Sequence, residues 1–270
     1  KKGVLTTFWP IIIFLYFQIE MVNKELKNAV IRKMKINIDT ITRASKELIG
    51  NIIRTPTIRS QHLSSKINGE VFLKLENLQH TSSFKVRGAY TSITRLKEEQ
   101  KKMGVIAMSA GNHAQAVAWW AKKERVNATI VMPEHAPLFK VMKTKSLGAD
   151  VILRGRTLNE SQTYVSELVN DKKLTLIHPY DDSNVVIGQG TLGLEFMEDI
   201  KDLDLLVIPI GGGGLISGVS IVAKALNPNI KIYGVQTEKF PSMYNVLHKK
   251  DLAILGDTLA DGIAVKRPGK

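Results

Sequence analysis

The sequence predicts an α/β protein with two open, mostly parallel sheets and helices on both faces. Short apolar runs rich in β-branched residues alternate with longer segments of helical spacing, which is typical of βαβ units. The apolar runs do not alternate apolar with polar residues, as expected when helices cover both faces of a sheet. The 270 residues, 44% of them hydrophobic, are enough for one large or two ordinary domains.

The predicted elements follow one another in a regular order. A helix is expected at residues 40–50, ending before Gly50 and Asn51, and a strand at residues 71–77. The next strands are GVIAMS (104–109), ATIVMP (128–133), ADVILR (149–154) and LTLIHP (174–179). The segments HAQAVAWWAKKE (113–124), LFKVMKTKSLG (138–148) and TLNESQTYVSELVNDK (157–172) form the helices between and after them. The alternation of strands and helices continues with a strand at 204–210, a helix at 215–226 and a strand at 230–236.

Charge and composition exclude several classes of protein. The net charge of +13 is scattered along the chain, and no basic stripe is interleaved with aromatic residues, so we expect small anions and not nucleic acid as partners. The chain has no cysteine, which fits a cytoplasmic protein, and its six histidines show no HxH or HExxH spacing. We therefore expect no metal site.

The N-terminal residues 1–33 are expected to be an extension outside the fold. Residues 1–20 contain two lysines and an apolar run that Pro10 interrupts, without the cleavage site of a signal peptide. The run is also short for a membrane span. We expect Met21 or Met34 to be the native start, with a membrane anchor as the alternative.

Four consecutive glycines, Gly211–Gly214, follow an apolar run and precede a helical segment. Glycines permit backbone conformations that a Cβ resists, and they let amide groups approach an anion at the positive end of a helix. A tight turn needs only one or two glycines. Neither G-x-G-x-x-G nor a following GK[ST] is present, which excludes a dinucleotide fingerprint and a Walker loop. The stretch therefore predicts a binding site for a phosphate that is not part of a nucleotide.

Residues 109–113, SAGNH, open a helix after a predicted strand. Ser109 is a candidate N-cap, free amides at this point could bind a carboxylate, and Asn112 could donate to a phenolic or carbonyl oxygen. An ordinary capped helix start explains the same residues.

Lys85 lies between Phe84 and Val86. Burial among apolar groups lowers the pKa of a lysine and favours its nucleophilic amine, although a surface lysine with its stem over its neighbours is the simpler interpretation. A nucleophilic lysine, a carboxylate-binding helix start and a phosphate loop together specify pyridoxal 5'-phosphate acting on an amino acid.

Five motifs in this order resemble the threonine/serine dehydratase group, the fold-type II, tryptophan synthase β-like enzymes that use pyridoxal phosphate. They are QHTSSFKVRGAY (79–90), SAGNHAQAVA (109–118), HPYDDSNVVIGQGTLGLE (178–195), PIGGGGLISG (209–218) and LADGIAVKRPG (259–269). The resemblance extends from about residue 38 to the last residue.

The resemblance implies a role for each site residue. Lys85 would hold the cofactor as a Schiff base, Phe84 would pack beside it, and Asn112 would bond the phenolic oxygen of its ring. The phosphate would be held by Gly211, Gly212, Gly213, Gly214 and Leu215. The substrate-binding residues would be Ser83, Ser109, Ala110, Gly111 and His113.

Three positions depart from relatives in the group. The family has glycine where this chain has Ser82, and a positive φ there would cost a serine about 1 kcal/mol or somewhat more. Serine racemases in the group carry a second serine as acid and base at the position of Ala110, so elimination is favoured over racemisation here. Some racemases begin a divalent-ion site with glutamate where this chain has Gln236.

The chain stops at KRPGK, whereas members of the family continue with a segment that completes the large domain. That segment supplies a hydroxyl or thiol opposite the pyridine nitrogen. We therefore expect the sequence to be a fragment or a truncated gene product.

The resemblance implies two domains, a smaller one at 104–181 and a larger one combining 34–103 with 182–270. The cofactor would lie in the cleft between them. The expected activity is deamination of L-threonine, and also of L-serine, to 2-oxobutanoate or pyruvate plus ammonia, in isoleucine biosynthesis or threonine catabolism. Serine racemase-type activity, β-replacement and a truncated, non-catalytic protein that binds pyridoxal phosphate are the alternatives. We expect a homo-oligomer, a dimer or tetramer, with no membrane partner.

Other conspicuous residues have structural interpretations. Arg87 is expected to be structural or to lie near an anion. Asp181 and Asp182 are expected at a helix start, and Trp119 and Trp120 in core or interface packing.

Overall fold

The computed structural model describes residues 36–270, apart from the side chains of Leu158 and Asn159, and has the predicted α/β architecture. The predicted N-terminal extension at residues 1–33 lies outside the described residues. The helices are α2 (Ile38–Leu48), α3 (Gln61–Ile67), η1 (Glu76–Leu78), α4 (Lys85–Thr94), α5 (Glu98–Met103), α6 (Asn112–Lys123), α7 (Leu138–Ser146), α8 (Leu158–Lys172), α9 (Ser183–Asp199), α10 (Gly214–Leu226), α11 (Ser242–His248) and η2 (Asp261–Ile263). The strands are β1 (Thr57–Arg59), β2 (Phe72–Lys74), β3 (Val105–Met108), β4 (Ala128–Met132), β5 (Asp150–Leu153), β6 (Thr175–Leu176), β7 (Leu205–Pro209) and β8 (Lys231–Val235).

The largest sheet has four parallel strands in the order β5-β4-β3-β6. From β3 the chain proceeds to β4 and β5 on one side, and it then returns to place β6 on the other side. The strand order therefore reverses between β3 and β6. In open α/β sheets, such a reversal leaves a crevice at the carboxyl ends of the two strands, where ligands bind.

Both faces of this sheet are covered, which explains the missing alternation in the sequence. Val105 and Ala107 of β3 pack in one core cluster with Trp120 of α6. Ile106, between them, points to the opposite face, where it packs with Val165 of α8. Each strand residue is therefore apolar whichever way it points.

A parallel pair, β7 and β8, forms a second sheet, and α10 packs on one face of it. Leu206 and Ile208 of β7 face Val219 of α10, whereas Val207 between them is 55% exposed. The pair β1–β2 is antiparallel. The sequence predicted β2 but not β1, because the three residues of β1 are too few for a strand pattern to be recognised and none of them is buried.

Arg87 anchors the helix that begins with Lys85. Its guanidinium is fully buried and makes bidentate hydrogen bonds of 2.7–3.0 Å to Glu76 of η1 and Glu195 of α9. The next residue, Gly88, allows α4 to cross α9 closely, because a Cβ there would lie 2.4 Å from Gln189 Nε2. The structural interpretation of Arg87 is confirmed.

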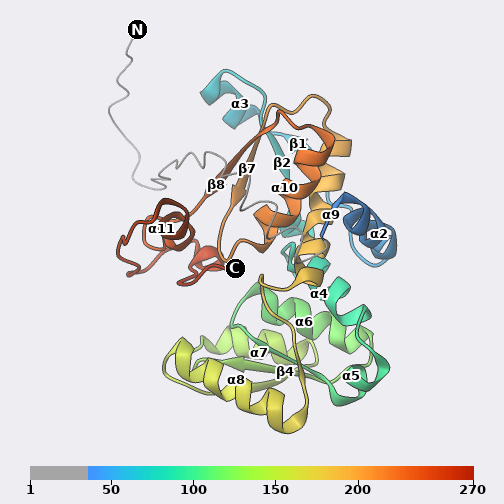
Figure 1. Cartoon of the computed structure of the whole chain (residues 1–270), viewed down its shortest axis with the longest axis vertical. Coiled ribbons are helices and arrows are strands. Elements are labelled where there is room, and N and C mark those ends of the chain that lie inside the picture. The colour runs from blue at the N-terminus through green and yellow to red at the C-terminus, as the bar shows by residue number, and fades with distance from the viewer. Residues whose placement is uncertain (1–35) are drawn as a thin grey trace.

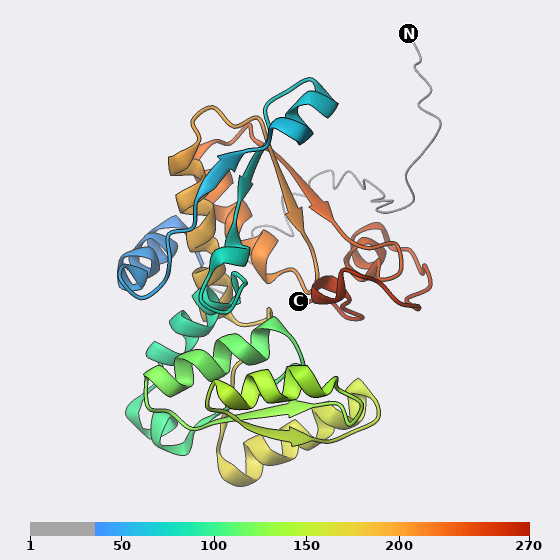
Figure 2. The same ribbon diagram turned by 180° about the vertical axis from the view of Figure 1, so that it is seen from behind.

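Two lobes are visible in Figures 1 and 2. The four-stranded sheet with α6, α7 and α8 forms the lower lobe in Figure 1, and β7, β8, α9 and α10 belong to the upper one. The C-terminal segment, drawn in red, lies at the level where the lobes meet. The domain boundaries at 104, 181 and 182 remain predictions.

Several smaller predictions can be compared with the structure. The strand expected at 174–179 is paired only over Thr175–Leu176, because the chain turns at His178 and Pro179. Asp182 is the N-cap of α9, as expected, with its side chain accepting from the Val185 amide. Trp120 is buried, and Trp119 stacks on His80. Within residues 36–270, no helix has the length and apolar character needed to cross a membrane.

Candidate active site

Two loops meet at the carboxyl ends of β3 and β6. The first contains Ser109, Ala110 and Gly111, and the second begins at Ile177. The His113 ring links them, since its Nε2 lies 2.8 Å from the carbonyl oxygen of Ile177. A carbonyl only accepts, so Nε2 carries the proton. The other ring nitrogen, Nδ1, is buried and has no partner among the described residues.

Lys85 reaches the second of these loops from the first turn of α4. Its Nζ donates to the carbonyl oxygen of Pro179 at 2.5 Å and lies 5.4 Å from the centre of the Phe84 ring. Within the described part of the chain, no carboxylate forms an ion pair with it. Burial lowers the pKa of Lys85 from 10.5 to about 8. Lys85 thus has a nucleophilic amine, and the group that accepts its hydrogen bond, the carbonyl of Pro179, is uncharged.

The turn before α4 fixes the direction of Lys85. Ser82 has φ of +57°, so the strained position predicted from the sequence is present. Ser83 is buried, and its hydroxyl accepts from the Lys85 amide at 3.4 Å. Two residues further on, Arg87 holds the helix against η1 and α9.

Two neutral imidazoles surround the lysine. Burial, with a smaller contribution from the Lys85 charge, lowers the pKa of His113 to about 3. Burial also lowers the pKa of His178, although Asp181 and Asp182 oppose this shift. Nδ1 of His178 accepts from the Asp181 amide at 2.8 Å. Neither imidazole adds positive charge near Lys85 at neutral pH.

The glycine loop, Gly211–Gly214, follows β7 and enters α10. Gly213 has φ of +102° and is the N-cap of α10, a left-handed conformation that favours glycine. Among residues 36–270, the amides of Gly211, Gly212 and Gly213 have no protein acceptor. Gly214 and Leu215 are the first residues of α10, where amides lack intrahelical partners. The loop therefore presents a run of free donors at the positive end of a helix.

The second loop connects the lysine with the glycine loop. Pro179 accepts from Lys85, and the ring of Tyr180, the next residue, packs on Gly212, where a Cβ would lie 2.1 Å from its Cγ. The dipeptide Pro179–Tyr180 thus contacts the Lys85 amine through its first residue and the glycine loop through its second.

The C-terminal strap, residues 260–269, closes the site from another side. A Cβ at Gly211 would lie 3.1 Å from Cγ2 of Val265, and one at Gly262 would lie 4.0 Å from Nδ2 of Asn112. The Gly269 amide donates to the carbonyl oxygen of Gly212 at 2.9 Å. Asn112 is exposed and begins α6 near this strap.

Ser109 is not the N-cap of α6, and that prediction is wrong. Gly111 is the N-cap, and the Ser109 hydroxyl accepts from the Gly111 amide at 3.1 Å. The helix begins two residues later than a serine cap would place it, so the first-turn amides carry no side-chain cap. Ala110 packs partly buried beside the core.

The sequence did not single out His178, Pro179 and Tyr180 as parts of the site, although they lie in one of the motifs that carry the family resemblance. No general rule makes a histidine, a proline carbonyl or a tyrosine a cofactor neighbour. The available signal was the strand order, which places the loop after β6 beside the loop after β3.

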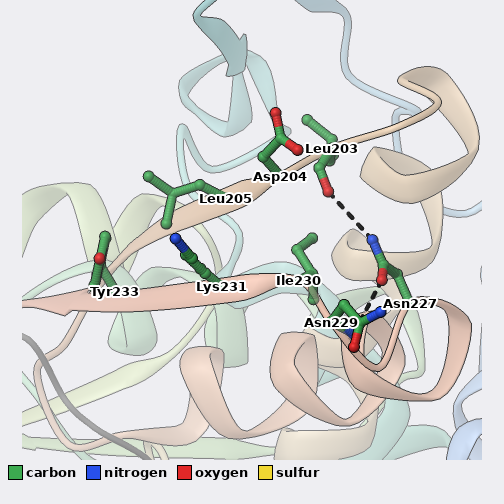
Figure 3. Close-up of a pocket in the computed structure, with 8 residues that line it drawn as sticks. All are labelled: Leu203, Asp204, Leu205, Asn227, Asn229, Ile230, Lys231 and Tyr233. Carbon is green, nitrogen blue, oxygen red and sulfur yellow. Dashed lines mark hydrogen bonds between the residues drawn. The ribbon is translucent and has the colours of Figure 1, made fainter.

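A cavity of about 430 Å³ lies elsewhere, at the amino ends of β7 and β8 (Figure 3). Asp204, Asn227 and Lys231 are among its lining residues, and Asn227 donates to the carbonyl oxygen of Leu203 at 3.3 Å. The glycine loop follows the opposite ends of the strands, so this cavity is separate from the site.

Among the described residues, no group of three histidine, aspartate or glutamate side chains could hold a metal ion.

The residues present fit a ligand that carries both an aldehyde and a phosphate. The amine of Lys85 is uncharged to a useful extent near neutral pH, as imine formation requires. The glycine loop offers free amides that suit a phosphate. A side chain at Gly212 would collide with Tyr180, so the loop is built for close backbone approach.

Comparison with known proteins agrees with this fit. Residues 48–270 match the family described as "Pyridoxal-phosphate dependent enzyme". The L-threonine ammonia-lyase of Thermotoga maritima is 49% identical over 236 residues, which are 87% of this chain and 59% of that protein. The chain therefore spans about three fifths of the length of this curated relative.

Solved structures show the same architecture. Threonine deaminase isoform 2 from Solanum lycopersicum superposes with a TM-score of 0.79 at 38% identity, over 87% of this chain and 67% of that one. Serine racemase from Dictyostelium discoideum gives 0.78 at 37% identity, over 84% and 74% of the two chains. The neighbours thus include both a deaminase and a racemase.

Proposed function

Since the chain belongs to the pyridoxal-phosphate dependent enzyme family, we propose that it deaminates L-threonine, and also L-serine. The products are 2-oxobutanoate or pyruvate, with ammonia. One observation carries the proposal: a partly buried amine, with no carboxylate partner among residues 36–270, lies one dipeptide away from a loop of free amides. The threonine ammonia-lyase of Thermotoga maritima supports the choice of substrate.

Lys85 would hold the cofactor through its Nζ, and the amides of Gly211–Leu215 would hold the phosphate. Phe84 would pack beside the ring, and the exposed Asn112 amide would donate to its phenolic oxygen. When bound, pyridoxal phosphate supplies an electron-withdrawing ring that delocalises the charge left by loss of the α-proton.

The chain's own residues would bind the amino acid and move its α-proton. The first-turn amides of α6 lack a side-chain cap, so the loop at Ser109–Gly111 can receive the substrate carboxylate. Nζ of Lys85 would be the base that takes the α-proton of the bound amino acid, and burial, which lowers the pKa of this amine to about 8 in the free chain, favours that role. The β-hydroxyl would leave as water, and hydrolysis of the released enamine by a second water would give the oxo acid and ammonia.

His113 and Ser83 would position these groups. The His113 side chain is buried against Ile177, so we assign its imidazole to holding the two loops together and its backbone to the carboxylate loop. The buried Ser83 hydroxyl orients the start of α4 through the Lys85 amide.

The test is turnover by the purified chain loaded with pyridoxal phosphate. L-Threonine should yield 2-oxobutanoate and ammonia in equal amounts, and a Lys85→Ala variant should lose at least about 10³-fold in rate, as expected when the residue that binds the cofactor and moves the proton is removed. Absence of oxo acid from a preparation that shows cofactor absorbance would argue for a non-catalytic protein that binds pyridoxal phosphate.

Racemisation is the second candidate, because a serine racemase is among the solved neighbours. Ala110 stands where that activity needs a second proton carrier, and it has no group that titrates. With L-serine as substrate, pyruvate should therefore greatly exceed D-serine.

We further propose that the protein acts in the cytoplasm as a homo-oligomer without nucleic-acid or membrane partners.

A further inference from the structure

We infer that Tyr180 is a positioning residue that holds the glycine loop in the geometry needed to retain the phosphate of the cofactor. The inference rests on the cofactor site proposed above, but it does not depend on which amino acid is the substrate. Tyr180 was not among the residues that the sequence singled out, and the proposed reaction gives it no role.

Tyr180 contacts two of the four glycines of the loop. A Cβ built on Gly212 would lie 2.1–2.3 Å from Cγ, Cδ1 and Cδ2 of the Tyr180 ring, so the ring rests directly on that Cα. A Cβ on Gly214 would lie 2.8 Å from the carbonyl oxygen of Tyr180 and 3.0 Å from its Cα. The side chain and the backbone of one residue therefore define the surface on which the loop lies.

The hydroxyl end of Tyr180 is fixed as well. It donates to the carbonyl oxygen of Arg267 in the C-terminal strap at 2.8 Å. The same strap returns to the loop, because the Gly269 amide donates to the carbonyl oxygen of Gly212 at 2.9 Å. Ring, strap and loop thus form a closed set of contacts in which each member restrains the other two.

The backbone of Tyr180 is held on both sides. Pro179, before it, accepts from Nζ of Lys85, and His178 accepts from the amides of Tyr180 and Asp181. The His178 ring also meets the Tyr180 ring edge-on, with centres 4.7 Å apart. Asp182 then caps α9. The separation between the lysine amine and the glycine loop is therefore set through this short segment.

Such restraint matters because the loop consists of glycines with free amides. An unrestrained run of four glycines would lose much conformational entropy on ordering around an anion. If a rigid aromatic ring already orders the loop in the folded protein, little of this entropy is lost on binding. The loop then binds an anion more tightly. The phosphate, and not the aldehyde, is the part of the cofactor that depends on Tyr180.

The experiment compares the affinities of pyridoxal phosphate and pyridoxal, which lacks the phosphate, for the cofactor-free chain. Tyr180→Phe keeps the ring and removes the bond to Arg267, so the preference for the phosphate should fall about threefold to tenfold. Tyr180→Ala should reduce it by about tenfold or more, because the donors to a charged group are no longer held in place. Binding is followed by absorbance without any substrate, so failure of the proposed deamination would not affect the result.

A matched control is Tyr164→Ala in α8. Tyr164 is also partly buried and aromatic, but it packs with the core on the far face of the four-stranded sheet. It should lower the melting temperature and leave the preference for the phosphate unchanged. Gly212→Ala should destabilise the chain, and Tyr180→Ala should relieve that effect in the double variant. An unchanged preference in both Tyr180 variants, or an equal loss in the Tyr164 variant, would overturn the inference.

Discussion

Two lysines, Lys74 and Lys85, show how the partners of a residue decide its chemistry. The Lys74 side chain is 4% exposed and forms ion pairs with Glu195 and Asp199 at 2.9 and 3.0 Å, so its charge is neutralised. Lys85 Nζ, by contrast, has one hydrogen-bond acceptor among residues 36–270, the uncharged carbonyl oxygen of Pro179. Desolvation without a compensating carboxylate favours the neutral amine. The absence of an acidic neighbour among the described residues is thus as important as the burial itself.

The reactivity of Lys85 should therefore depend on pH differently from that of an exposed lysine. Its folded pKa of about 8 lies below its ordinary value of 10.5, so the neutral amine predominates above about pH 8. Competitive reductive methylation of the cofactor-free chain, with peptide mass mapping, should show labelling of Lys85 rising to a plateau near pH 9. Exposed lysines such as Lys66 and Lys102 serve as internal controls in the same digest. A Lys85 profile that matches these controls would contradict the assignment.

At the scale of elements, the position of Lys85 depends on α4, the helix that begins with this residue. Arg87 joins α4 to η1 and α9 through two buried bidentate pairs, with Glu76 and with Glu195. Burial alone would lower the pKa of Arg87, but its bonds to these two carboxylates raise it above the ordinary value. The start of α4, and with it Lys85, is therefore placed by contacts that do not touch the ligand.

Replacing Arg87 with methionine should remove the charged partner of the buried Glu76, which keeps only the hydroxyl of Thr55, and should leave Glu195 with Lys74 alone. We expect a loss of about 3–5 kcal/mol in the free energy of unfolding, measured by urea denaturation. Arg95→Met, one residue beyond the same helix, removes a more exposed pair with Glu47 and should cost less than about 1 kcal/mol. Equal effects of the two substitutions would show that the buried pairs do not anchor α4.

The sequence predicted most elements at this scale, and the reason is physical. Both faces of β3, β4 and β5 are covered or flanked by helices, so continuous apolar runs mark these strands. Four consecutive glycines at 211–214, and a lysine at 85 between two apolar residues, are uncommon patterns that indicate a binding site. The antiparallel β1, the true N-cap of α6 and the role of Pro179 depend on tertiary contacts, which local patterns do not contain.

At the scale of the whole molecule, the candidate site draws on widely separated parts of the chain. The loops after β3 and β6, the start of α4, the glycine loop and the C-terminal strap meet where the two lobes join (Figures 1 and 2). Pro179, which accepts from the lysine, follows β6 of the four-stranded sheet, whereas the phosphate donors follow β7 of the second sheet. The family resemblance of residues 48–270 is consistent with this arrangement, because the match spans both lobes.

The most direct test of this account is to identify the residue that carries the cofactor. The chain is incubated with pyridoxal phosphate, reduced with borohydride and digested, and the modified peptide is sequenced by mass spectrometry. We predict that one equivalent is fixed on Lys85, and that a Lys85→Ala variant retains no comparable label. Modification spread over surface lysines, or unchanged in the Lys85→Ala variant, would contradict the central claim.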